Sequence, residues 1–177
     1  MGQKVNPHGM RVGVIKDWDS RWFTSKQEFG DTLVEDHKIR KTLKKQLYAA
    51  GVPKIEIERT VDSQTGTPRV KVNVFCAKPG IVIGKGGAES AKIEKQLAKL
   101  TGKNVNLNIV EVKGTTTNAQ LVAEDVASQL ERRIAFRRAM KQVIRNAMQP
   151  RGGVPAKGIK VTCSGRLALS LIHISEP

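Results

Sequence analysis

A glycine-rich segment is the first part of this 177-residue sequence that could do chemistry. It reads Gly84-Lys85-Gly86-Gly87 and directly follows three apolar residues, Ile81 to Ile83. Glycine has no Cβ, so a glycine-rich backbone can approach a ligand closely, and the lysine adds a positive charge. These features make the segment a candidate site for the phosphates of a nucleotide or a nucleic acid.

Two nucleotide-binding patterns do not fit this loop. A P-loop needs four residues between its glycines, but only three separate Gly80 from Gly84. It also needs Ser or Thr after its lysine to hold magnesium, and Gly86 stands there. A dinucleotide-binding fingerprint needs a third glycine where Glu89 stands, and parallel strands around it. The pattern that fits is G-x-x-G, the loop that KH domains place between two helices to hold nucleic-acid phosphates.

Basic residues form the second candidate site. The chain carries 31 Lys and Arg against 16 Asp and Glu, a net charge of +15. Residues 132–175 hold ten of these basic residues and no acidic one. Solubility does not require that acids be absent from one segment, so the asymmetry indicates a polyanion partner, most simply nucleic acid.

The cations of this segment follow a helical repeat. The apolar stripe of the predicted helix consists of Phe136, Met140, Val143, Ile144 and Ala147. The opposite stripe carries cations four residues apart, namely Arg133, Arg137, Lys141 and Arg145, with Arg138 beside them and Arg132 just before. Steps of about 6 Å along such a row suit the phosphates of a single strand, without base selectivity. A solvated helix and a membrane-surface helix are the alternatives, and the second is disfavoured because the stripe lacks Trp and Leu.

The elements that position these residues are those of an α+β domain. A helix that ends near Gly51 precedes two alternating segments, 54–58 and 70–76, which a Gly/Pro-containing turn joins into an antiparallel hairpin. After the glycine loop come a helix that stops near Gly102 and a third alternating strand. The order is helix-strand-strand-helix-helix-strand, with residues 38–113 as the domain.

The flanking segments are predicted in less detail. Residues 1–37 are expected to form an irregular arm with a turn at Asn6 to Gly9. Its aromatic residues Trp18, Trp22 and Phe23 are expected to pin it to an apolar surface, either of its own domain or of a partner. After residue 114 we expect a helix to about Arg133, the basic helix, and a strand at 157–163.

Other chemistry is not visible in the sequence. The three histidines are far apart and share no ligand spacing with Cys76 or Cys163, so we expect no metal site and no cofactor. No apolar segment is long enough to cross a membrane, and no arrangement of Ser, His and Asp defines a catalytic site. The sequence therefore predicts a protein that is not an enzyme and has no membrane partner.

Four segments resemble small-subunit ribosomal protein three of the bacterial and organellar type. They are the opening Met1 to Gly9, the glycine loop, the Arg-rich stretch 128–141, and 157–167. The resemblance implies a type-two KH domain followed by a truncated α/β C-terminal domain over 114–167. After Leu167 the pattern is lost, and we expect residues 168–177 to be a non-native tail that resembles a translated sequencing adapter.

The resemblance also implies a function. Members of this ribosomal protein family are structural constituents of the small-subunit head. They bind ribosomal RNA and neighbouring head proteins, and they line the channel through which messenger RNA enters. It implies that Arg137, Arg138 and Lys141 face the message, whereas Arg132 and Arg133 face either ribosomal RNA or Glu131. The expected location is a cytoplasmic ribosome, with an organellar ribosome left open. A free-standing KH-type regulator of messenger RNA is the alternative function.

Overall fold

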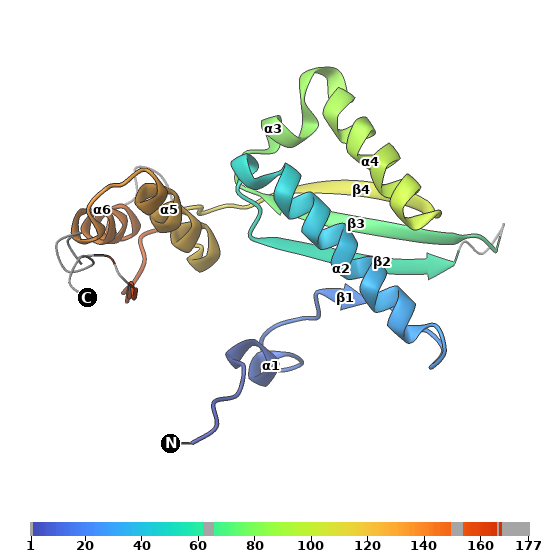
Figure 1. Cartoon of the computed structure of the whole chain (residues 1–177), viewed down its shortest axis with the longest axis horizontal. Coiled ribbons are helices and arrows are strands. Elements are labelled where there is room, and N and C mark those ends of the chain that lie inside the picture. Colours follow the sequence, from blue (N-terminus) through green and yellow to red (C-terminus); the bar gives the residue numbers. More distant parts are fainter. Residues whose placement is uncertain (1, 62–65, 150–153, 166, 168–177) are drawn as a thin grey trace, which may run out of the picture. The chain divides into compact units, whose positions relative to one another are not determined.

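The structure is a computed structural model that describes residues 2–61, 66–149, 154–165 and 167. The chain divides into two compact units, Met1–Val112 and Lys113–Pro177 (Figure 1). The candidate glycine loop belongs to the first unit, and the candidate basic row belongs to the second.

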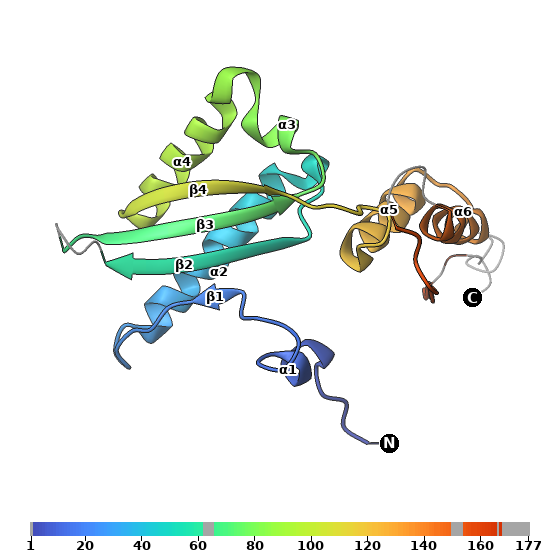
Figure 2. The same ribbon diagram turned by 180° about the vertical axis from the view of Figure 1, so that it is seen from behind.

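The first unit is built on a four-stranded sheet in the order β1-β2-β3-β4. Its strands are Ser20–Arg21 (β1), Lys54–Val61 (β2), Pro68–Cys76 (β3) and Asn104–Glu111 (β4). β2 and β3 are antiparallel, which confirms the predicted hairpin, whereas β1 runs parallel to β2 and β4 parallel to β3. The long helices α2 (Phe29–Gln46) and α4 (Ala88–Thr101) pack on one face, and Figure 2 shows the other face without a helix in the described part of this unit.

Alternation along the strands decides which face is buried. Val70, Val72, Val74 and Cys76 of β3 are at most 1% exposed, and they pack against apolar stripes of both helices. A shift of one residue would turn this whole set to solvent, so the pattern specifies the register. Burial, followed by the nearby Glu111 carboxylate, raises the pKa of the Cys76 thiol, as expected for a cysteine that serves as a small hydrophobe.

The N-terminal arm is more ordered than the sequence predicted. Pro7–Arg11 form a short helix, α1, where only a turn was expected. Asn6 caps this helix by accepting a hydrogen bond from the backbone N–H of His8 (2.9 Å), and proline at its first position supplies a helical φ. Farther along, the arm adds β1 to the edge of the sheet, and α2 begins at Phe29, inside the segment assigned to the arm.

A buried carboxylate holds the arm against the sheet. Asp36 of α2 has no exposed side-chain surface, and it accepts hydrogen bonds from Trp22 Nε1 (2.7 Å), Ser20 Oγ (3.2 Å) and Arg59 Nε (3.0 Å). These donors come from the arm and from β2, so one carboxylate joins three elements. Sequence reasoning missed Asp36, although its place on the buried stripe, three residues before Ile39, was a signal.

The aromatic residues of the arm behave differently from one another. Trp22 is partly buried, and its ring centroid lies 5.5 Å from that of Phe29. Trp18 and Phe23 remain 62% and 98% exposed. Trp22 therefore packs on its own unit, because its indole N–H reaches a buried acceptor. That Trp18 and Phe23 pin the arm to a partner stays a prediction.

The second unit contains the helices α5 (Ala119–Glu131) and α6 (Phe136–Met148), which pack against each other. Asn118 caps α5 by accepting from two backbone N–H groups of its first turn. Residues 157–163 do not form the predicted strand, because a strand needs a neighbour for its backbone groups and the described residues provide none. The predicted tail, residues 168–177, lies outside the described residues.

Candidate nucleic-acid interface

The glycine loop lies between α3 (Pro79–Ile83) and α4, as the sequence predicted. Gly84 adopts φ +70° and ψ −173°, a region of backbone conformation that is essentially restricted to glycine. A Cβ at this position would also lie 2.7 Å from Cγ of Glu89. Gly86 and Gly87 have φ angles of +60° and +81°. Glycine at 84 is therefore required by the fold itself, independently of any ligand.

The open side of the loop is formed by Gly86 and Lys85. A Cβ built at Gly86 would meet no heavy atom within 4 Å, so its backbone borders open space. The Lys85 side chain is exposed and has no ion-pair partner within the described parts of the chain. The first turn of α4 follows directly, and it has no side-chain cap. The combination of an open glycine backbone and one exposed cation suits a phosphate.

The turn between α5 and α6 corrects the predicted row of cations. The Arg133 N–H donates to the Leu130 carbonyl (2.9 Å) and the Ile134 N–H to the Gln129 carbonyl (3.1 Å), which is the Schellman arrangement at a helix C-terminus. It holds Arg133 at φ +60°, the single positive φ among the described non-glycine residues. Arg133 thus lies in the turn and not on the basic helix, whose row begins at Arg137.

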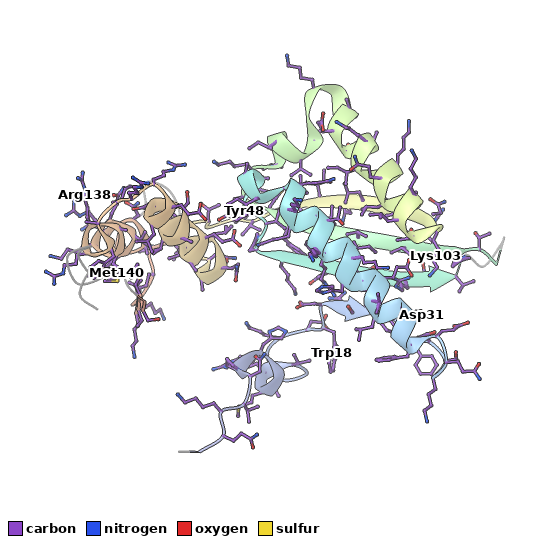
Figure 3. All side chains as sticks on the ribbon, in the orientation of Figure 1. Trp18, Asp31, Tyr48, Lys103, Arg138 and Met140 are labelled. Carbon is purple, nitrogen blue, oxygen red and sulfur yellow. The ribbon has the colours of Figure 1, made fainter. Side chains whose placement is uncertain are left out.

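The cations of α6 face solvent. The helix buries a stripe of small residues, Ala139, Val143 and Ala147, while its cations Arg137, Arg138, Lys141 and Arg145 are all exposed. Arg138 is labelled in Figure 3 among the side chains that extend from α6. The guanidinium of Arg137 lies 5.7 Å from the ring centroid of Phe136, a cation–π contact that leaves its N–H donors available.

Among the residues that the structure describes, no carboxylate forms an ion pair with this basic surface. Arg132 and Arg133 are exposed like the cations of α6, and neither forms an ion pair with Glu131 or with any other residue that the structure describes. Two partners were expected for these arginines, ribosomal RNA or Glu131. Glu131 is not their partner in the described structure, so ribosomal RNA remains. Six exposed cations in one short stretch of chain form a surface that attracts a polyanion.

Two properties of the described residues bear on other functions. They contain no group of three or more His, Cys, Asp and Glu side chains placed to hold a metal ion. None of their helices combines the length and apolar composition that a membrane span needs.

Comparison with known proteins decides the family. The family model described as "KH domain" matches residues 38–116, and the model described as "Ribosomal protein S3, C-terminal domain" matches residues 126–175. The chain is 55% identical over 176 residues to small ribosomal subunit protein uS3 of Desulforamulus reducens, an alignment that covers 99% of this chain and 75% of the relative. The chain belongs to the uS3 family.

Two further uS3 relatives agree with this assignment. That of Alkaliphilus oremlandii is 58% identical over 167 residues and that of Clostridioides difficile 60% identical over 168 residues. Each alignment covers 94% of this chain, but the chain spans only 66% and 58% of these two relatives. The resemblance seen in the sequence is confirmed, and so is the fold class, a KH domain followed by the C-terminal domain of the uS3 family. Because the relatives are named as ribosomal proteins, the expectation that the chain is not an enzyme is also confirmed.

Proposed function

We propose that this chain is a structural constituent of the small-subunit head in a cytoplasmic ribosome. There it binds ribosomal RNA, contacts neighbouring head proteins, and lines the channel through which messenger RNA enters. Membership of the uS3 family supports the ribosomal role, and the KH domain supports RNA binding. The contact with the message is supported by the cations of α6.

The observation that carries this proposal is the exposed, unneutralised row on α6. Arg137, Lys141 and Arg145 follow one another at four-residue intervals while the opposite stripe is buried against the unit's own core. A helix held in this way presents its cations without rearranging when RNA arrives. Phosphate contacts of this kind carry no base information, which suits a channel that must accept every message.

The glycine loop is proposed as a separate contact. Gly84 and Gly87 shape the turn, Gly86 leaves room for a phosphate, and Lys85 supplies the charge. Arg132 and Arg133, at the turn before α6, are proposed to extend the basic surface toward ribosomal RNA.

Salt-dependent RNA binding tests the contact with the message. Arg137→Glu with Arg138→Glu in the full chain is expected to weaken binding of a single-stranded RNA and to lower the salt slope by about 1.4, because each lost phosphate contact contributes about 0.7. The matched control is Lys95→Glu with Lys99→Glu, two exposed lysines on α4 that carry the same change in charge. Equal losses in both variants, or unchanged translation of a structured message by ribosomes that carry the α6 variant, would contradict the proposal.

Sedimentation separates the ribosomal role from that of a free-standing KH regulator. The ribosomal role requires that the chain migrate with small subunits after a high-salt wash. Recovery of the chain only in the soluble fraction would favour the regulator.

A further inference from the structure

A second basic surface lies along α2 in the first unit. A cavity of about 1040 Å³ opens between α2, the short turn Tyr48–Ala50 and the start of β2. Its lining contains a single carboxylate, that of Asp19, against five cations: Arg40, Lys41, Lys44, Lys45 and Lys54. Tyr48, at the end of α2 in Figure 3, is 48% exposed. We call this cavity the α2 groove.

Three of the five cations are engaged by the fold. Arg40 donates to the backbone carbonyl of Asp19 and to Ser20 Oγ, both at 2.9 Å. The Lys44 ammonium donates to the backbone carbonyl of Val52, and Lys54 pairs with Asp19 at 3.3 Å. These contacts fix the walls of the groove and neutralise its one acid.

Lys54 also keeps its charge. Burial lowers the pKa of its ammonium, but hydrogen bonds and charge interactions with the carboxylates of Glu56 and Asp19 outweigh burial, so the pKa is raised. The Lys54–Glu56 contact is 2.6 Å. The Lys54 ammonium therefore stays charged at neutral pH, and its two carboxylate partners hold it in place.

The remaining two cations are available to a ligand. Lys41 and Lys45 are exposed and have neither a hydrogen bond nor an ion pair within the described residues. They stand one helical turn apart, about 6 Å along α2, on the wall that leads to Tyr48. An exposed aromatic ring next to a row of cations is the combination that single-stranded nucleic acid uses, with bases stacked and phosphates neutralised.

An acidic protein is a poorer match for this surface. Protein interfaces depend on apolar or aromatic anchors in deep pockets. The apolar residues Val52 and Ile55 that line the groove are themselves only 1% and 8% exposed, so Tyr48 is the anchor that remains. Cations and one ring suit a sugar-phosphate chain better than a folded partner.

We infer that the α2 groove is a second RNA-binding surface of the KH unit, in which Lys41 and Lys45 hold phosphates and Tyr48 stacks on a base. None of the residues that line it belongs to the glycine loop, and α4 packs on another side of α2 through a hydrogen bond from Gln46 to Gln96 (2.9 Å). The unit then has two independent RNA contacts. The inference rests on the proposed function only in taking RNA as the partner.

The test compares two pairs of lysines in the full chain. Lys41→Glu with Lys45→Glu is titrated against a fluorescein-labelled single-stranded RNA by anisotropy at several KCl concentrations. We expect affinity to fall at least tenfold and the salt slope to fall by about 1.4, because two phosphate contacts are lost. The control, Lys95→Glu with Lys99→Glu, is expected to keep both values. Lys41→Gln with Lys45→Gln removes charge without reversing it, and circular dichroism checks that α2 is intact.

Crosslinking supplies a second readout that does not depend on a variant. The chain is irradiated with RNA that contains 4-thiouridine and digested with trypsin, and the peptide 46–54 that carries Tyr48 is expected to hold crosslinked nucleotide. Crosslinks confined to residues 84–87 and 132–145, or equal losses of affinity in the groove and control variants, would overturn the inference.

Two further outcomes separate this inference from the proposed function. If Arg137→Glu with Arg138→Glu abolishes RNA binding while the groove variants bind normally, the proposed function stands and the groove is not an RNA site. If the groove variants lose binding of a polyglutamate peptide and keep RNA binding, the partner is an acidic protein and the inference is wrong. A wild-type chain that binds no RNA overturns both.

Discussion

Replacing Asp36 by asparagine tests whether one buried carboxylate joins the N-terminal arm to the KH unit. The Asp36 carboxylate accepts from Trp22, Ser20 and Arg59 and has no exposed surface. Asparagine has nearly the same shape, but an NH2 group replaces one of the two oxygens. This NH2 group then faces the N–H or O–H groups that donate to the carboxylate in the unchanged chain. The variant also removes the negative charge that balances Arg59, whose side chain is only 12% exposed.

The expected loss of stability follows from these contacts. Removing one partner of a buried ion pair costs about 3–5 kcal/mol. Arg59 keeps a second partner, Glu35, at 3.1 Å, so the loss belongs at the lower end, about 3 kcal/mol. For a unit of this size, that corresponds to a decrease in melting temperature of about 10 °C.

Thermal unfolding followed by circular dichroism measures this loss, and the fluorescence of Trp18 and Trp22 reports on the arm. Asp31→Asn is the matched control, because Asp31 is exposed in the first turn of the same helix and its removal costs about 0.5 kcal/mol through the helix dipole. We expect trypsin to cleave the arm of the Asp36→Asn variant faster. If both variants lose the same stability, the reasoning about the buried network is refuted.

Four further predictions concern the turn, the glycine loop and the two cysteines. Arg133→Gly is expected to raise the free energy of unfolding by about 1 kcal/mol, because glycine adopts φ +60° without strain; a lower urea midpoint would contradict this. Gly84→Ala is expected to cost about 2–3 kcal/mol in the same assay and Gly86→Ala about 1 kcal/mol, since only the first adds a clash to the backbone strain; equal costs would count against the packing argument. Iodoacetamide is expected to modify Cys163 before the buried Cys76 in the folded chain and both alike in guanidinium. Because the Cys76 thiol ionises above its ordinary pKa of 9.0 when folded, its contribution to stability falls as the pH rises through 9, which urea unfolding at pH 8 and pH 10 measures.

Local pattern was enough for the order of elements from α2 to α6. Period-two alternation marked β2, β3 and β4, and helical spacing marked α2, α4 and α6, because each pattern arises from neighbours within a few residues of chain. The glycine loop was found for the same reason, since its spacing and its apolar neighbours are contiguous. The exposure of the α6 cations was also foreseeable, as their apolar counterparts occupy the opposite stripe.

Tertiary structure decided what depends on distant residues or on backbone conformation. Asp36 meets donors 14, 16 and 23 residues away, so no local pattern shows that it is buried and satisfied. Arginine rarely adopts a positive φ. Only the hydrogen bonds that close the turn, from the N–H groups of Arg133 and Ile134, show why the chain leaves the helix at Arg133. In the α2 groove, contacts across the fold engage Arg40, Lys44 and Lys54, whereas Lys41 and Lys45 have no partner among the described residues. Composition and spacing thus determined where positive charge accumulates along the chain, whereas packing determined which of those charges can reach a ligand, because a cation's partners are set by what the fold brings beside it.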